Sequence, residues 1–167
     1  MKKYELLADD TVTNISGTTL YRIRALTDIP SIDVRYGDLG GYVEYERNLS
    51  HERTAWVFGA ARVYGDARVF GDARVFGDAQ VFGDAQVFGD AQVTENCSRT
   101  VVCIAGLLYD ITITDDHLRA GCQCHTFDAW RKFGERDILE MDGRAALRFY
   151  PTLIALMDAV LAARGTK

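Results

Sequence analysis

The sequence lacks several features that would place it in a well-marked class. Its 167 residues include four cysteines, too few for a disulfide scaffold in a chain of this size. We find no run of about 18 apolar residues that would span a bilayer, and the opening Met-Lys-Lys-Tyr-Glu has no signal-peptide stretch. These absences predict a soluble protein of the cytoplasm with no membrane partner.

A basic block is also missing. The net charge is −5, with 7 basic and 9 acidic residues over 1–56, 3 and 5 over 57–92, and 9 and 10 over 93–167. Proteins held on duplex DNA by phosphate contacts need clustered Lys and Arg, so a duplex-DNA partner is not expected. Hydrophobic residues make up 48% of the chain, enough for a folded core.

The chain does contain an internal repeat of six residues. From Val57 to Gln92 it reads VFGAAR, VYGDAR, VFGDAR, VFGDAQ, VFGDAQ, VFGDAQ. An aliphatic first residue and a small fifth residue at this period indicate a parallel β-helix, in which 18 residues make one coil of three faces. Alternation on a strand then turns Ala and Val inward and Arg and Phe outward, with Gly-Asp at each corner.

The outward residues form predicted columns. At a spacing of 18, Phe58 lies under Phe76, Tyr64 under Phe82 and Phe70 under Phe88. Stacked rings would stabilise neighbouring coils. Six outward aromatics also exceed what a monomer usually exposes, so we expect these same residues to form an oligomer interface on at least one face.

Three segments carry a resemblance to a known family: TLYRIRAL (Thr19–Leu26), GDLGGYVEYERNLS (37–50) and HERTAWVFGAARVYGDA (51–67). Over about residues 18–95 the chain resembles hexapeptide-repeat proteins of phages and prophages, within the left-handed β-helix superfamily best known for trimeric acyltransferases. The resemblance implies a left-handed parallel β-helix of three to four coils, a homotrimer, and the cytoplasm of a bacterial host. It brings no activity with it.

We therefore expect a mainly β protein in three parts: an N-terminal β cap (1–37), the β-helix (38–98) and a small C-terminal α+β domain (99–167). The cap is predicted as a hairpin of 4–7 and 18–26, with Arg22 and Arg24 on a solvated face or an anion site. The C-terminal part is predicted as strands at 101–106, 108–114 and 117–125, a helix at 127–133 capped by Thr126, and a helix at 143–163.

Catalytic and metal sites are not expected. Cys122 and Cys124 share a predicted strand face with Leu118, which favours structural cysteines, with a metal site or a redox pair as the alternatives. His51 is the one candidate base for an acyltransferase, and no insertion interrupts the repeat. The Gly-Asp corners do not form a phosphate-binding loop. We expect no cofactor, and no metal.

The polar side of the C-terminal hairpin is the predicted ligand site. An Arg flanked by His and Thr could hold an anion such as a phosphate, and a following helix could add stacking and charge. The alternatives are a solvated sheet face or a subunit contact. The predicted ligand-binding residues are Thr112, Thr114, His117, Arg119, Gln123, His125, Trp130 and Arg131.

The sequence thus favours a non-enzymatic, phage-type accessory binding protein that presents its C-terminal domain on a trimeric stalk. It would sequester a small anionic ligand, such as a nucleotide immune signal, or bind a host defence protein. The alternatives are a degenerate hexapeptide acyltransferase and a structural assembly or virion protein.

Overall fold

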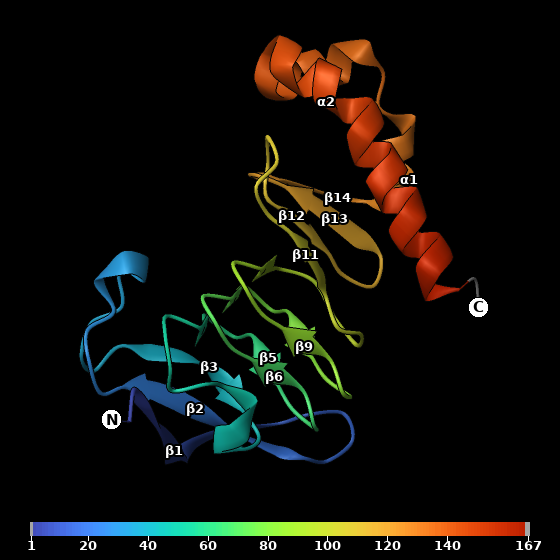
Figure 1. Ribbon diagram of the computed structural model, residues 1–167. Coiled ribbons are helices and arrows are strands. Elements are labelled where there is room, and N and C mark those ends of the chain that lie inside the picture. The colour runs from blue at the N-terminus through green and yellow to red at the C-terminus, as the bar shows by residue number, and fades with distance from the viewer. Residues whose placement is uncertain (1, 166–167) are drawn as a thin grey trace.

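The computed structural model describes residues 2–165 as two lobes that lie one above the other (Figure 1). The N-terminal strands and the repeat form one lobe, and a sheet with two helices forms the other. Each lobe has its own hydrophobic core.

The first lobe opens with an antiparallel hairpin. β1 (Tyr4–Thr13) pairs with β2 (Thr19–Ala25), and β2 pairs with β3 (Leu39–Val43). The predicted hairpin is confirmed, although β1 is longer than expected. Short 3-10 turns follow β2 and β3 at η1 (Pro30–Ile32) and η2 (Glu46–Asn48).

Arg22 and Arg24 are both engaged within this hairpin. Arg24 pairs with Glu5 across the strands at 2.5 Å, and Arg22 pairs with Asp10 at 3.1 Å. Arg22 also donates to the carbonyl of Gly40. Their guanidinium groups are therefore used inside the lobe, which disfavours the anion site considered from the sequence.

The repeat, which we call the repeat segment (56–93), forms strands of only two residues each. They are β4 (Trp56–Val57), β5 (Arg62–Val63), β6 (Arg68–Val69), β7 (Arg74–Val75), β8 (Gln80–Val81), β9 (Gln86–Val87) and β10 (Gln92–Val93). Strands eighteen residues apart pair in parallel, as in the column Trp56, Arg74 and Gln92. Gly-Asp turns separate the strands, and Gly71, with φ +72°, occupies a conformation that favours glycine.

Small aliphatic side chains fill the interior of this segment. The Ala and Val of each block are buried, from Ala61 and Val63 to Ala91 and Val93. The predicted aromatic columns are confirmed as stacked pairs, with ring centroids 4.8 Å apart for Phe58 and Phe76 and 5.6 Å apart for each of the other two. All six rings are half-buried. Self-association through them remains a prediction.

The second lobe is a four-stranded antiparallel sheet covered by helices. The strands, in spatial order, are β11 (Val102–Ile104), β12 (Ile111–Ile113), β13 (His117–Ala120) and β14 (Gln123–Thr126). α1 (Phe127–Lys132) begins at Thr126, whose hydroxyl accepts from the Ala129 N–H, so the predicted cap is confirmed. We call these four strands the C-terminal sheet.

α2 (Glu135–Arg164) is broken at Asp142 and Gly143, where φ/ψ leave the helical region. This break agrees with the predicted helix start at 143. By length and composition alone α2 could cross a membrane, contrary to the expectation from the sequence. A single helix of this kind is weak evidence for a membrane span, and α2 also places Leu153 and Met157 in the second core. The cytoplasmic location remains a prediction.

The predicted fold class, a mainly β, left-handed parallel β-helix, is wrong. Residues 2–165 form a mixed α/β structure of four separate small sheets, and no solenoid or closed helix is shown. The repeat indicated one continuous architecture. Instead, its two-residue strands are divided among three sheets, one of which also contains the antiparallel hairpin. The prediction that the C-terminal domain is presented on a trimeric stalk depended on this fold class and is therefore not supported.

Candidate anion-binding site

A tight turn decides which residues share a face of the C-terminal sheet. We predicted one strand over 117–125, but the chain turns at Gly121 and Cys122, where Gly121 has φ +58°. β13 and β14 pair antiparallel, with Arg119 opposite Cys124 and Leu118 opposite His125. The turn therefore puts Gln123 and His125 on the opposite face from Arg119, and this part of the predicted grouping is wrong.

The face with Gln123 and His125 lies against the helices. The His125 ring lies edge-on to Trp130, with centroids 5.1 Å apart, and its Nε2 is 3.1 Å from Gln123 Oε1. Burial, followed by the nearby His117, lowers the pKa of His125. Trp130 is buried and donates to the carbonyl of Leu118 at 2.7 Å. These residues hold the second core together.

Arg131 lies apart from the predicted group. Its guanidinium pairs with Asp158 of α2 at 2.6 Å and links the two helices. An anion held by Arg119 is therefore not shared with Arg131.

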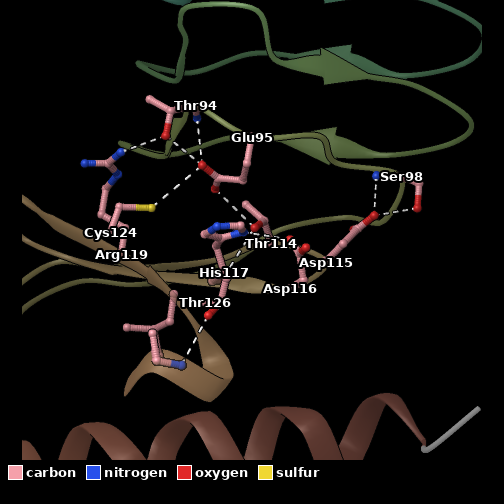
Figure 2. A network of polar contacts seen from close by, with 12 residues as sticks. Thr94, Glu95, Ser98, Thr114, Asp115, Asp116, His117, Arg119, Cys124 and Thr126 are labelled. Atoms are coloured by element: carbon pink, nitrogen blue, oxygen red, sulfur yellow. Dashed lines mark hydrogen bonds and ion pairs between the residues drawn. The ribbon is translucent and has the colours of Figure 1, made fainter. Parts of the chain in front are cut away.

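The other face of the sheet lies against the end of the repeat segment (Figure 2). Arg119 donates from Nε to the carbonyl of Gln92 at 3.2 Å and from Nη2 to Thr94 Oγ1 at 3.1 Å. Thr114 Oγ1 donates to Glu95 Oε1 at 3.1 Å. The polar face predicted as a ligand site is thus largely a contact between the two lobes.

His117 lies at the edge of this contact. Its Nδ1 is 2.7 Å from Asp116 Oδ1, and its backbone carbonyl accepts from the Thr114 N–H at 3.0 Å. The neighbouring Asp115 accepts from Ser98 N–H and Oγ–H at 2.7 and 2.6 Å. These bonds join the residues after the repeat to the sheet.

The cysteines do not occupy the predicted positions. Cys122 is exposed in the turn, and Cys124 lies on the polar face with Sγ 3.7 Å from Glu95 Oε2. Burial, and then the Glu95 carboxylate, raises the pKa of Cys124. Burial also raises the pKa of Cys97 to about 12 and that of Cys103 to about 11. Protonated thiols are poor nucleophiles and poor metal ligands, and no metal-binding group of three is found within 2–165.

His51, the candidate base, has both ring nitrogens engaged. Nδ1 accepts from the Lys3 backbone N–H at 3.1 Å, and Nε2 is 2.8 Å from Glu46 Oε1. The ring also stacks on Tyr4, with centroids 4.4 Å apart. A general base needs a free nitrogen within reach of a substrate proton, and this arrangement favours a structural role.

The two lobes leave a cavity of about 430 Å³ beside Arg119. We call it the junction cavity. Its lining residues come from the repeat segment and from the C-terminal sheet and its loops: Arg74, Asp90, Gln92, Leu108, Tyr109, Asp110, Thr112, Arg119 and Gly121.

Arg74 is the unexplained charge in this cavity. Its Nε is buried and has no hydrogen-bond partner among residues 2–165. A buried donor without a partner costs free energy, so such an atom calls for an explanation. Thr112, 7% exposed, and Arg119 face each other across β12 and β13 and line the same cavity.

Of the predicted residues, the structure brings Thr112 and Arg119 to this cavity. The repeat pattern placed Arg74 among the outward side chains but did not identify it as a site residue. One signal was present, because Arg gives way to Gln at the equivalent repeat positions after Arg74. Nothing in the sequence said which of Arg62, Arg68 and Arg74 the second lobe would cover.

Comparison of the chain with models of protein families and with curated proteins gives no match. The resemblance to phage proteins therefore remains a prediction, and the function is argued from geometry.

Proposed function

We propose that the protein is a non-enzymatic binding protein that takes up a small anionic ligand in the junction cavity. The observation that carries the proposal is that Arg74 of the repeat segment and Arg119 of the C-terminal sheet line one cavity. A guanidinium group presents a fork of donors that matches the oxygens of a phosphate or carboxylate. An oxyanion in the cavity would accept from the outer guanidinium nitrogens of Arg74, because its Nε is covered by protein atoms.

The charges of the cavity narrow the class of ligand. Asp90 and Asp110 line it together with Arg74 and Arg119, so the positive and negative charges balance. A bare anion would gain little net attraction, since each carboxylate opposes it. A ligand with both an anionic group and hydrogen-bond donors would satisfy both kinds of residue.

A phosphorylated nucleoside has this chemistry. Its phosphate would bind the guanidinium groups, and its amino or hydroxyl groups would donate to Asp90 or Asp110. Tyr109, also in the lining, places an aromatic side chain at the edge of the cavity. The volume of about 430 Å³ falls within the range of roughly 300–1,000 Å³ typical of small-molecule sites.

Thermal unfolding with AMP, cyclic AMP and inorganic pyrophosphate tests the proposal. A ligand at 100 times its Kd adds about 2.7 kcal/mol to the free energy of unfolding. We expect AMP or cyclic AMP to raise the midpoint more than pyrophosphate does, because pyrophosphate has no donor for Asp90 or Asp110.

Arg74→Gln is the decisive variant, and Arg68→Gln is its matched control. Gln already occupies the equivalent position at Gln80, Gln86 and Gln92, so the repeat tolerates it. Arg68 is the equivalent residue of the preceding block and is exposed. We expect Arg74→Gln to abolish the nucleotide effect and Arg68→Gln to retain it. Equal shifts in the two variants, or no shift with any of the three anions, would contradict the proposal.

A further inference from the structure

A second cavity lies on the opposite face of the C-terminal sheet from Arg119. It has a volume of about 190 Å³, lies between the sheet, α1 and α2, and is partly open to solvent. Apolar and aromatic side chains form most of its wall: Trp130, Ile138, Met141, Ala146, Phe149 and Leu153. Trp130, Ile138 and Leu153 are almost fully buried.

The break in α2 explains why this space is open. Asp142 and Gly143 leave the helical conformation, so Met141 and Ala146 line the cavity from two separate helical segments. Ala120 on β13 and Ala146 on α2 both line it with short side chains. The volume that larger residues would occupy at these positions remains empty.

Two of the polar residues that line the cavity, Tyr109 and Asp142, are paired with each other. Tyr109 Oη donates to Asp142 Oδ2 at 2.6 Å, which joins the loop before β12 to the break in α2. The Tyr109 ring lies edge-on to Phe149, with centroids 5.6 Å apart. Burial, and then this hydrogen bond, raises the pKa of Tyr109 to about 12, so its hydroxyl is neutral.

We propose that this cavity binds a small uncharged aromatic molecule of about one ring. A cavity of roughly 150 Å³ lined by apolar side chains can bind benzene, and this one is of similar size. Trp130 and Phe149 offer edge-to-face contacts, and the Met141 thioether is suited to an aromatic ring. A charged ring would lose its hydration without a partner and, if anionic, would meet the Asp142 carboxylate.

Quenching of tryptophan fluorescence by iodobenzene tests the proposal. Trp130 lines this cavity, whereas Trp56 is buried in the other core, so a Trp56→Phe background reports on Trp130 alone. We expect saturable loss of emission, reversed by toluene, which lacks the heavy atom. Benzoate is expected not to compete. Quenching that rises linearly with iodobenzene, or that toluene does not reverse, would overturn the proposal.

Filling the cavity provides the second measurement. Ala146→Leu places a larger side chain in the cavity and is expected to weaken iodobenzene binding at least about tenfold. Ala155→Leu is the control, because Ala155 is exposed on the same helix. Equal binding by both variants would overturn the proposal. If Ala146→Leu fails to fold, as judged by circular dichroism, competition by toluene in the Trp56→Phe background still tests whether the cavity binds an aromatic molecule.

This site shares Tyr109 with the junction cavity, but the variants that test the two sites change other residues. Arg74→Gln is expected to leave iodobenzene binding unchanged, and Ala146→Leu is expected to leave any nucleotide effect unchanged. Failure of one proposal therefore does not imply failure of the other.

Discussion

Arg164, the last residue of α2, donates a hydrogen bond to the backbone carbonyl of Thr114, which follows β12. Its other guanidinium nitrogen reaches the carbonyls of Thr100 and Ile113 at 3.1 and 3.2 Å. One side chain thus fastens the end of the long helix to the sheet and to the segment that leaves the repeat.

Arg164→Gln should therefore destabilise the second lobe. A shorter neutral side chain would leave these carbonyls without their charged donor, at a cost of about 1–3 kcal/mol. Urea unfolding followed by Trp130 fluorescence in the Trp56→Phe background measures this loss. Arg148→Gln, at an exposed position of the same helix, is the control and should change little. Equal stability of the two variants would show that the Arg164 contacts contribute nothing.

Asp72 should make the first lobe sensitive to acid. Its carboxylate accepts from Arg53 Nε at 3.0 Å and from Thr54 Oγ1 at 2.8 Å, and these bonds hold its pKa at about 2. A lowered pKa in the folded state adds stability above the unfolded pKa of about 3.9, and that stability disappears as the pH falls toward 2.

The comparison of Asp72→Asn with the unchanged chain tests this expectation. The variant should be less stable at pH 6, and the difference should shrink between pH 4 and pH 2. Thermal unfolding across that range measures it. A difference that stays constant with pH would exclude ionisation of Asp72 as its source.

Asn48 is a fully buried amide with all its contacts inside the first lobe. Its Nδ2 donates to the carbonyls of Gly65 and Ala67 at 3.0 and 2.8 Å, and its Oδ1 accepts from the Tyr45 N–H at 2.7 Å. Asn48→Asp keeps the shape but replaces two donors with a charged acceptor. We expect a loss of about 3 kcal/mol or more at pH 7.

The loss in Asn48→Asp should diminish in acid. Protonation removes the buried charge and restores one donor, so the destabilisation relative to Asn should decrease as the pH falls below the raised pKa of the new carboxyl. Urea unfolding at pH 7 and pH 4 measures the change. Asn48→Asp as stable as the unchanged chain at pH 7 would contradict this account.

Two glycines should respond differently to alanine. A Cβ on Gly41 would lie 2.4 Å from the Ala61 carbonyl oxygen, whereas a Cβ on Gly77 would meet no atom within 4 Å. Gly77 has φ +64°, so Gly77→Ala should cost only about 1–2 kcal/mol of left-handed strain.

Gly41→Ala should cost more, because backbone must move to admit the methyl group. Chemical denaturation of both variants in parallel checks the order. A smaller loss for Gly41→Ala than for Gly77→Ala would show that β3 and the repeat segment are not in close contact.

Local features were predictable from the sequence because each is set by residue spacing or by residue type. The stacking of Phe58 on Phe76 follows from the six-residue period taken three blocks at a time, and the cap at Thr126 follows from residue type. The fold class was not predictable, because two-residue strands divided among separate sheets give the same periodicity as one continuous architecture.

The candidate site depended on information that the sequence does not carry locally. Nine residues of alternating polarity predicted one strand, and the turn at Gly121 moved His125 to the other face. Arg74 is distinguished from Arg68 by the lobe that packs over it, which is a tertiary contact. Thr112 and Arg119 were correctly predicted to share a face of the sheet, because both precede the turn at Gly121.

The eighteen-residue spacing between paired strands limits how this chain could change in length. Gain or loss of three blocks would restore every column and would keep an equivalent position beneath Arg119. Gain or loss of a single block would change which column ends beneath the C-terminal sheet. A side chain from another column would then line the junction cavity. Insertions or deletions of blocks would therefore preserve the lining of the junction cavity only when they add or remove a multiple of three blocks. This holds even though the blocks are nearly identical in sequence.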